Sequence, residues 1–358
     1  MKSFDLEQYL NNGIETLVKG ILRAAFKNPK ASAYFAGYAL SAKKAEKRRC
    51  ELEKQGEHIP SFLIASITGA CNLNCAGCYD RANRACGSEE EMSGKHWRNV
   101  FEQAEEIGVS AILLAGGEPF MRPDVIEEAA KTQSILFPVF TNGTKMTDRH
   151  YDMLEKNRNI LPVISIEGEE VQTDLRRGKG VYEKTISTMA ELEARGLLFG
   201  ASITVTSENL MEVTSSEFLG KLGRKGCKAV VFVEYVPVEK PEMALNNPQR
   251  DFLEKRVSGL RASEDVIIIS FPGDEKMSGG CLAAGRGFFH INAYGRAEPC
   301  PFSPYSDTGL KDKTLREALK SPLFTRLREG GNLLKEHSGG CALFDQADDV
   351  KALLEVRV

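Results

Sequence analysis

The sequence predicts an α/β protein built on a partial (β/α)6 barrel of parallel strands, with a helical N-terminal extension and a small α+β module at the C-terminal end. Two observations carry this prediction. From Ser61 onward, short apolar segments alternate with amphipathic helical segments, and glycine or polar residues follow directly after the apolar segments. Six such units are fewer than the eight of a closed barrel, so we expect an open one.

The expected strands are short and apolar, and helical patterns such as 95–107 and 182–195 separate them. The six strands are Phe62–Thr68, Ala111–Ala115, Phe137–Thr141, Pro162–Glu167, Phe199–Thr206 and Ala229–Val236. Functional groups of such folds gather where parallel strands end. The residues that follow these strands are therefore the first place to look for a site.

Residues 1–60 show helical patterns and no strand pattern. One apolar face recurs at three-to-four spacing between Leu6 and Ala25, and a second helical stretch runs from about Ala31 to Lys54. Eleven Lys and Arg against seven Asp and Glu give these residues a net charge of +4. Residues 1–58 could contact a membrane surface or an acidic partner, but helices packed on the barrel with a solvated charged face are the commoner arrangement.

Composition narrows the classes of protein further. The chain has 358 residues, 42% hydrophobic and 27% charged, with a net charge of −3. Disorder and bulk nucleic-acid binding do not fit these values. Without an apolar run of membrane-spanning length or a signal-peptide pattern, we expect a cytoplasmic protein divided at 1–60, 61–240 and 241–358.

Nine cysteines are the unusual feature, because an odd number excludes complete internal disulfide pairing. Cys71, Cys75 and Cys78 follow the first expected strand at spacings of three and two intervening residues. A structural zinc site usually takes four ligands, and this loop offers three. An iron–sulfur cluster held by three cysteines leaves one iron open to an outside ligand.

The cysteine loop and the later strand ends together resemble the radical S-adenosylmethionine (radical SAM) superfamily. Its Cys-x3-Cys-x2-Cys motif matches here, and its strand-end motifs match Gly116-Gly117-Glu118-Pro119, Thr141-Asn142-Gly143-Thr144 and Ser165-Ile166-Glu167-Gly168. One departure is Gly77, where many members carry an aromatic residue; Tyr79 is expected to supply that surface.

The resemblance implies a [4Fe-4S] cluster on Cys71, Cys75 and Cys78, with SAM on its open iron. It assigns the SAM ammonium to Gly116, Gly117 and Glu118, beside Pro119 and Asn142. It assigns the SAM carboxylate to Ser165 and Arg177, a ribose hydroxyl to Glu167 and the adenosine to Thr204. Ser165 and Thr204 could equally be ordinary polar residues of their strands. Arg177 could form a surface ion pair instead of binding SAM.

The chemistry implied by the resemblance is reductive cleavage of SAM to a 5′-deoxyadenosyl radical, which removes hydrogen from an unactivated C–H bond. A low-potential flavodoxin or ferredoxin would supply the electron. Tyr235, at the end of the sixth strand, is either a donor to a substrate radical or, more commonly for such a residue, a core aromatic.

The last third of the chain loses the strand–helix rhythm after about Pro237. Val266–Phe271 could be a further strand, and segments 287–291 and 296–299 flank a hairpin turn at 292–295. A Cys-x13-Gly-x4-Cys pattern spans this hairpin, formed by Cys281, Gly295 and Cys300, and Cys341 follows it. This pattern resembles the auxiliary-cluster module of the SPASM/twitch branch.

Three cysteines leave a second [4Fe-4S] cluster one ligand short. The fourth ligand could be the substrate, His290, His337, Asp345 or another cysteine, and three ordinary thiols are the alternative to a cluster. The isolated Cys50, Cys86 and Cys227 are expected to be small buried thiols, with a ligand role left open for Cys86.

Two classes of function remain at this point. The first is a radical SAM enzyme acting on a small molecule, a peptide or a lipid-like substrate. The second is a non-enzymatic zinc or iron–sulfur protein, a binding module or an electron carrier, which would have no use for the GGEP strand end.

Overall fold

The computed structural model describes residues 20, 28–82, 89–264, 266–274, 279–330, 333–334 and 340–355. Most of the first helical pattern, Cys86 and His337 lie outside the described residues. In the described part of the chain, no helix has the length and apolar character needed to cross a membrane.

One ten-stranded sheet organises the molecule, in the order β10-β9-β8-β1-β2-β3-β4-β5-β6-β7. Strands β1 to β7 pair in parallel with their sequence neighbours, which confirms the α/β prediction. Their bounds are β1 Phe62–Ser66, β2 Ala111–Ala115, β3 Phe137–Thr141, β4 Ile160–Ser165, β5 Gly200–Val205, β6 Ala229–Glu234 and β7 Ile267–Phe271. The seventh parallel strand extends the six-unit arrangement.

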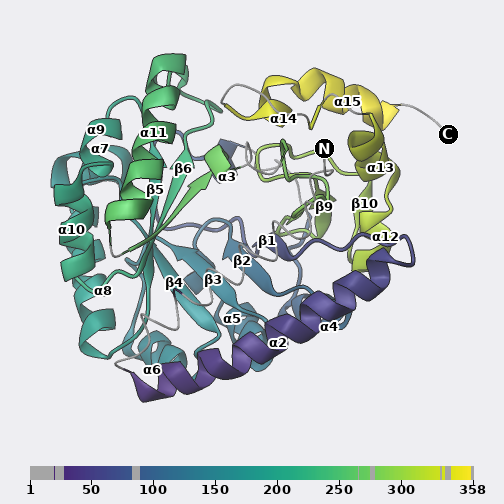
Figure 1. Cartoon of the computed structure of the whole chain (residues 1–358), viewed down its shortest axis with the longest axis horizontal. Helices are drawn as coiled ribbons and strands as arrows, with labels where there is room; N and C mark the ends of the chain where they lie inside the picture. Colours follow the sequence, from purple (N-terminus) through teal and green to yellow (C-terminus); the bar gives the residue numbers. More distant parts are fainter. Residues whose placement is uncertain are drawn as a thin grey trace.

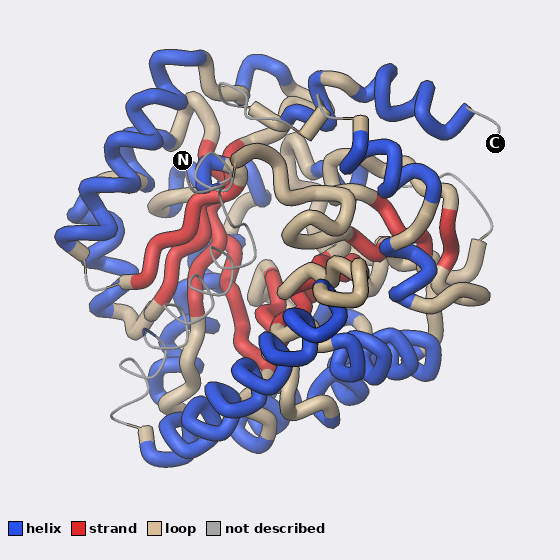
Figure 2. The backbone as a smooth tube through the Cα atoms, turned by 45° about the vertical axis from the view of Figure 1, so that its right-hand side comes forward, coloured by secondary structure: helices blue, strands red, loops and turns tan. Residues whose placement is uncertain are grey.

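Helices cover the outer face of this curved sheet, as Figures 1 and 2 show. The helices between the strands are α3 Tyr79–Ala82, α4 Gly94–Ile107, α5 Pro123–Lys131, α6 Asp148–Lys156, α7 Glu170–Arg177, α8 Val181–Ala194, α9 Leu210–Val213, α10 Ser216–Arg224 and α11 Asn247–Ser263. Two short 3-10 turns, Pro119–Met121 and Pro241–Met243, interrupt the loops. Glycines end α4 and α7, at Gly108 and Gly178.

Helix α2 (Pro29–Glu53) lies across the N-terminal ends of the barrel strands, along the lower side of Figure 1. Its Phe35 packs beside Leu136, which precedes β3, and Tyr38 Oη donates to Ser110 O, before β2, at 2.8 Å. The described part of the N-terminal extension therefore packs on the barrel, at the end opposite to the C-terminal ends of the strands.

The C-terminal hairpin belongs to the same sheet. Strands β8 (His290–Ile291) and β9 (Arg296–Glu298) flank the predicted turn, where Gly295 has a φ of +86°. Strand β8 pairs in parallel with β1, and β10 (Thr308–Gly309) pairs with β9. Helices α12 Leu315–Leu319, α13 Pro322–Glu329, α14 Ala342–Asp345 and α15 Ala347–Glu355 follow.

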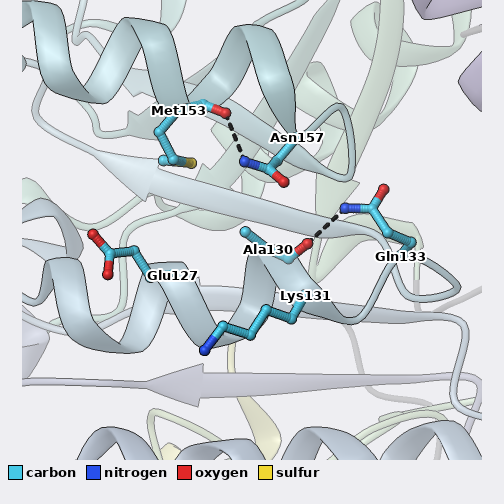
Figure 3. Close-up of a pocket in the computed structure, with 6 residues that line it drawn as sticks. All are labelled: Glu127, Ala130, Lys131, Gln133, Met153 and Asn157. Atoms are coloured by element: carbon cyan, nitrogen blue, oxygen red, sulfur yellow. Dashed lines mark hydrogen bonds between the residues drawn. The ribbon is translucent and has the colours of Figure 1, made fainter.

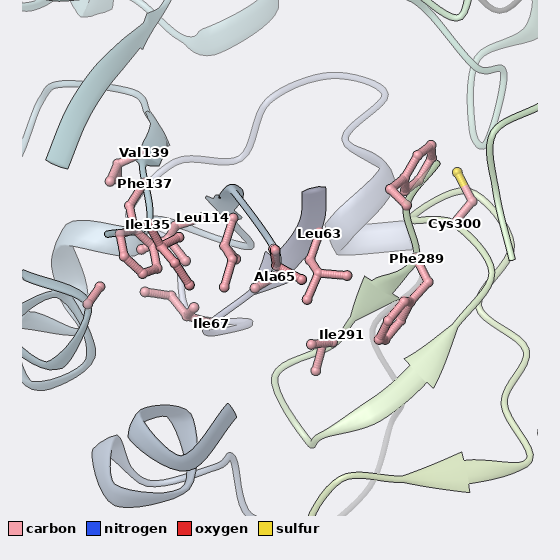
Figure 4. Close-up of a cluster of buried hydrophobic side chains, with 14 of the residues drawn as sticks. Leu63, Ala65, Ile67, Leu114, Ile135, Phe137, Val139, Phe289, Ile291 and Cys300 are labelled. Carbon is pink, nitrogen blue, oxygen red and sulfur yellow. The ribbon is translucent and has the colours of Figure 1, made fainter. Parts of the chain in front are cut away.

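Alternate side chains of the strands point outward into a continuous apolar core (Figure 4). Leu63 and Leu114 are completely buried there, as is Ile291 on β8. Burying one such side chain contributes about 1.5–3 kcal/mol, so the core fixes how the strands align. Strand alignment in turn sets where the C-terminal ends of β1 to β5 meet.

Candidate functional site

The cysteine loop begins where β1 ends and is braced from outside. Glu91 Oε1 accepts hydrogen bonds from Thr68 Oγ1 (3.0 Å) and from Gly69 N (2.8 Å). Arg122 Nη1 contacts Glu91 Oε2 at 3.1 Å and Ile67 O at 3.2 Å, so one ion pair ties the start of the loop to the residues after β2. Cys71, Cys75 and Cys78 are all partly exposed.

The GGEP segment after β2 is clasped directly to the cysteine loop by its backbone. Gly117 N donates to Thr68 O at 2.7 Å, and Glu118 N donates to Ala70 O at 2.8 Å. A Cβ atom on Gly117 would lie 2.1 Å from Ala70 O, and one on Gly116 would lie 2.3 Å from Thr68 O. The two glycines are therefore required by close backbone approach, whatever else they bind.

Gly117→Ala is expected to destabilise the protein by about 1–3 kcal/mol, because the added methyl group must push two backbones apart. Urea unfolding measures this loss, and iron incorporation should fall with it. Gly37→Ala is the control, since Gly37 lies within α2 with nothing near its missing Cβ, and it should be neutral or slightly stabilising. Equal stability of the two variants would contradict the clasp.

The carboxylate of Glu118 is buried in the layer of strand ends. Its oxygens accept hydrogen bonds from Thr141 Oγ1 (2.6 Å), Asn142 N (2.8 Å) and Phe120 N (3.1 Å). Burial raises the pKa of Glu118, against the lowering effect of these three donors. The sequence assigned this carboxylate to the SAM ammonium, and the structure uses most of its acceptor capacity to join β2 to β3.

A second connection joins the cysteine loop to the end of β3. Asn142 Nδ2 donates to Asn72 Oδ1 at 3.1 Å, and Asn72 Nδ2 donates to Thr144 Oγ1 at 2.9 Å. Thr144 N and its hydroxyl in turn donate to Asn142 Oδ1. These contacts hold the residue after Cys71 against the third strand end.

Glu167, after β4, is the centre of a buried ion-pair network. Its Oε1 accepts from Arg176 Nη1 at 2.6 Å and from Arg177 Nη2 at 2.5 Å, and its Oε2 accepts from Thr204 N on β5 at 2.9 Å. Glu167 is 1% exposed, and the arginine side chains are 11% and 10% exposed. The sequence predicted contacts of Glu167 and Arg177 with SAM, whereas here they bind each other.

Arg177 also faces the cysteine loop. Burial alone lowers the pKa of its guanidinium, but Glu167 and the thiols of Cys75 and Cys78 raise it above its usual value. The backbone carbonyl of Arg176 accepts a hydrogen bond from Ala76 N at 2.8 Å. The C-terminal end of α7 thus places a cation beside two of the three cysteines. The ion pair expected as the alternative for Arg177 is present, with Glu167 as its partner, and it lies mostly below the surface.

Three thiols in one loop form a donor set that suits an iron–sulfur cluster. Burial raises the pKa of Cys71, and the nearby Glu118, Cys75 and Cys78 raise it further against a hydrogen bond from Leu73 N. Among the described residues, no three His, Cys, Asp or Glu side chains already converge as a metal-binding group. Cluster binding would therefore need the thiols to turn toward a common point and to release their protons.

Tyr235 lies behind this loop with 3% of its surface exposed. Its hydroxyl accepts a hydrogen bond from Lys240 N at 3.2 Å, and a Cβ on Gly77 would lie 2.4 Å from that hydroxyl. Gly77 has a φ of +64°, so glycine at this point of the motif leaves room for the tyrosine ring. The contacts match the core-aromatic reading of Tyr235.

The remaining residues assigned from sequence fall around the same strand ends. Ser165 is partly exposed at the end of β4, and Pro119 is buried in the turn after β2. Tyr79 is partly buried against Phe302, with ring centroids 5.1 Å apart. The Tyr79–Phe302 contact connects the cysteine loop to the segment that carries Cys300.

The C-terminal cysteines differ in burial, Cys281 and Cys300 being buried and Cys341 partly exposed. His290 was one candidate for a fourth ligand, and its two ring nitrogens contact Glu298 and Ser66, so binding a cluster would require it to give up the contact with Ser66. Cys227 is buried as predicted, but Cys50 on α2 is partly exposed.

Sequence reasoning missed several groups that shape the site. Glu91 and Arg122 carry no motif, and only the folded chain brings them to the start of the cysteine loop. Asn72 could have been found, because a side-chain amide within the motif faces the residues after β3. Nothing in the sequence indicated that Arg176, as well as Arg177, would pair with Glu167.

The structure also has a depression on its outer surface, of about 510 Å³, between α5 and α6 (Figure 3). Glu127, Lys131 and Met153 are among its lining residues. It lies in the helical layer outside the sheet and includes none of the strand-end residues described above.

Comparisons with known proteins agree with this arrangement. Residues 65–214 match the family model of the radical SAM superfamily. The AdoMet-dependent heme synthase of Methanosarcina barkeri is 25% identical over 79% of this chain and 88% of its own length. The PqqA peptide cyclase of Gluconobacter oxydans is 23% identical over 79% of this chain and 82% of its own.

Solved structures show the same fold. Streptococcus suis SuiB bound to S-adenosylmethionine has a TM-score of 0.64 at 16% identity, over 80% of this chain and 70% of that one. The anSMEcpe structure with bound AdoMet and Cp18Cys peptide has a TM-score of 0.58 at 15% identity, over 82% and 98% of the two chains. The cysteine loop and the strand-end motifs thus lie within the segment that matches the radical SAM superfamily, and this chain is similar to radical SAM enzymes of the SPASM/twitch type over most of its length.

Proposed function

We propose that this chain binds a [4Fe-4S] cluster through Cys71, Cys75 and Cys78 and uses it to cleave SAM reductively. The observation that carries the proposal is the backbone clasp between the cysteine loop and Gly117-Glu118, which holds the loop at the C-terminal ends of β1 and β2. When bound, the cluster and SAM supply an electron and a 5′-deoxyadenosyl radical that removes hydrogen from the substrate.

The chain's own residues bind and orient SAM in this proposal. Ser165 and Arg177 hold the SAM carboxylate, and Arg177 then exchanges part of its contact with Glu167 for that carboxylate. The carbonyls of Gly116 and Gly117, with the remaining acceptor capacity of Glu118, receive the ammonium. Thr204 and Glu167 would contact the adenosine, with Pro119, Asn142 and Tyr79 bounding the site and Tyr235 behind it.

We also propose a second [4Fe-4S] cluster on Cys281, Cys300 and Cys341, in a module formed by residues 241–358. Cys300 follows β9, whose partner β8 pairs with β1, so the proposed second site adjoins the strand that leads into the cysteine loop. The fourth ligand is then a group outside this set, such as Asp345 or the substrate.

Cys300→Ala is expected to lower the iron content by about four atoms per chain and to leave 5′-deoxyadenosine formation measurable, because the SAM-binding cluster is held elsewhere. Iron analysis after anaerobic reconstitution measures the iron content, and chromatography of the products measures 5′-deoxyadenosine formation. Unchanged iron content would contradict the second cluster.

For the substrate, we favour a peptide, the class that several relatives support. PqqA peptide cyclase carries it in its name, and SuiB has been solved with its precursor peptide SuiA. The heme synthase supports a small molecule as a second class of substrate. A lipid-like substrate would bind through residues 1–58. The electron donor would be a low-potential flavodoxin or ferredoxin.

The test of the proposed function uses the full chain after anaerobic reconstitution with iron and sulfide. A brown protein with about seven to eight irons is expected, and SAM with dithionite should give 5′-deoxyadenosine and methionine in equal amounts. A colourless zinc protein that releases neither product would instead support the non-enzymatic alternative.

A further inference from the structure

Two neighbouring arginines at the end of α7 bind the same carboxylate oxygen. Glu167 Oε1 accepts a hydrogen bond from Arg176 Nη1 at 2.6 Å, and it accepts from Arg177 Nε and Nη2 at 2.8 and 2.5 Å. The arginine side chains are 11% and 10% exposed, and that of Glu167 is 1% exposed. Two mostly buried cations therefore share one carboxylate.

Glu167 is the fixed member of this group. Its Oε2 accepts a hydrogen bond from Thr204 N on β5 at 2.9 Å. Its backbone N donates to Thr173 Oγ1 on α7 at 3.1 Å, and its carbonyl accepts from Asn209 Nδ2 at 3.0 Å. Because both the backbone and the carboxylate of Glu167 are held in this way, a change of pairing has to come from the arginines.

The group carries one positive charge more than it balances. Among the described residues, Glu167 is the only carboxylate within ion-pair distance of either guanidinium. Glu118 interacts electrostatically with Arg177, but the three donors described above already hold its oxygens. Unbalanced charge is costly in a buried site, so this group suits the addition of one more anion.

The two arginines differ in what else they face. The side chain of Arg177 interacts electrostatically with the thiols of Cys75 and Cys78, so it lies toward the cysteine loop. Arg176 Nε is buried and has no hydrogen-bond partner among the described residues. Buried donors in proteins are nearly always paired, so Arg176 has a donor in reserve with which to hold a carboxylate more completely.

We propose that Arg176 is a positioning residue that takes over the pairing of Glu167 when Arg177 turns to the carboxylate of SAM. The inference rests on the proposed function, because it presupposes that Arg177 binds SAM, and it names the group that makes this exchange possible. No covalent bond changes, and Arg176 itself does not touch SAM.

Charge balance gives the reason for a second arginine. If Arg177 were the sole cation beside Glu167, binding SAM would leave a buried carboxylate without a partner, which is strongly unfavourable. The two carboxylates would then compete for one guanidinium. With Arg176 in place, the carboxylates of Glu167 and SAM balance two guanidinium groups, and both can be paired at the same time.

The test is equilibrium dialysis of the reconstituted full chain without reductant, so that SAM binds and is not consumed. The second ligand is decarboxylated SAM, in which hydrogen replaces the carboxylate. Arg176→Gln is expected to weaken SAM binding by about 10- to 100-fold, the range for one hydrogen bond to a charged group. Decarboxylated SAM should bind Arg176→Gln and the wild type alike, since Arg177 then stays on Glu167.

Two further variants separate the exchange from a general loss of structure. In an Arg177→Gln background, Arg176→Gln should not weaken SAM binding further, because no arginine is left to be released. Arg149→Gln is the matched control: Arg149 donates to Glu127 Oε1 at 2.7 Å, but its side chain is 76% exposed. This variant should bind both ligands as the wild type does.

The lysine variants decide the question if Arg176→Gln does not fold. Arg176→Lys keeps a cation on Glu167 and should retain SAM affinity. Arg177→Lys should lose it, because an ammonium cannot bind a carboxylate through two parallel hydrogen bonds. Equal losses of SAM affinity in the two lysine variants would overturn the division of roles.

The remaining outcomes are also decisive. Equal weakening of both ligands in Arg176→Gln, or SAM affinity unchanged in that variant, overturns the positioning role and leaves the proposed function intact. Wild-type affinity of Arg177→Gln for SAM removes the contact on which the inference depends. A reconstituted wild-type chain that does not bind SAM instead overturns the proposed function itself.

Discussion

Replacing Cys71 by alanine is expected to reduce 5′-deoxyadenosine formation to background. Loss of an outer-shell partner of a metal ligand already costs about 10- to 100-fold, so removal of one of only three ligands should cost more. The measurement is product formation with SAM and dithionite, together with iron content, which should fall by about four atoms per chain.

Cys227→Ala is the matched control for this variant. Cys227 is a buried thiol on the approach to β6, and its Sγ contacts Ala229 O at 3.1 Å, far along the chain from the cysteine loop. Its replacement should leave iron content and product formation unchanged. If Cys71→Ala formed product at the wild-type rate, the assignment of the loop would be wrong.

Glu167→Ala is expected to lower the free energy of unfolding by about 3–5 kcal/mol, the cost of breaking a buried ion pair by removing one partner. Arg176 and Arg177 would both lose the carboxylate that balances their charge, and Thr204 N would lose its acceptor. Urea denaturation of the apoprotein measures this loss without any contribution from a cofactor.

The control removes an exposed glutamate. Glu102 pairs with Arg98 at 2.8 Å, but the two side chains are 56% and 55% exposed, so Glu102→Ala should change the free energy of unfolding by about 0.5 kcal/mol or less. Similar small effects of the two substitutions would show that the Glu167 network adds nothing to stability.

The strands that carry the site were predictable from sequence because each is an apolar run between two helical patterns. Because parallel strands end at one edge of their sheet, the sequence alone predicts that the residues after β1 to β4 lie close together. Leu63 and Leu114 point outward into the core, which leaves the opposite faces and the strand ends for function.

The contacts within the site were not predictable in the same way. Strand β8 spans two residues, too few for a periodic pattern, and its partner β1 lies more than two hundred residues earlier in the chain. The contact of His290 with Ser66 depends on that pairing, so no spacing rule predicts it. The assignment of Glu167 and Arg177 from motifs likewise could not show that the two side chains bind each other.

The most direct test of the central claim, that the cysteine-loop cluster binds SAM on an open iron, is pulsed electron–nuclear double resonance on the reduced holoprotein with SAM carrying ¹⁵N in its amino group and ¹⁷O in its carboxylate. The account predicts resolved coupling of both labels to the cluster, lost in Cys71→Ala. A reduced cluster that shows no coupling to either label would contradict it.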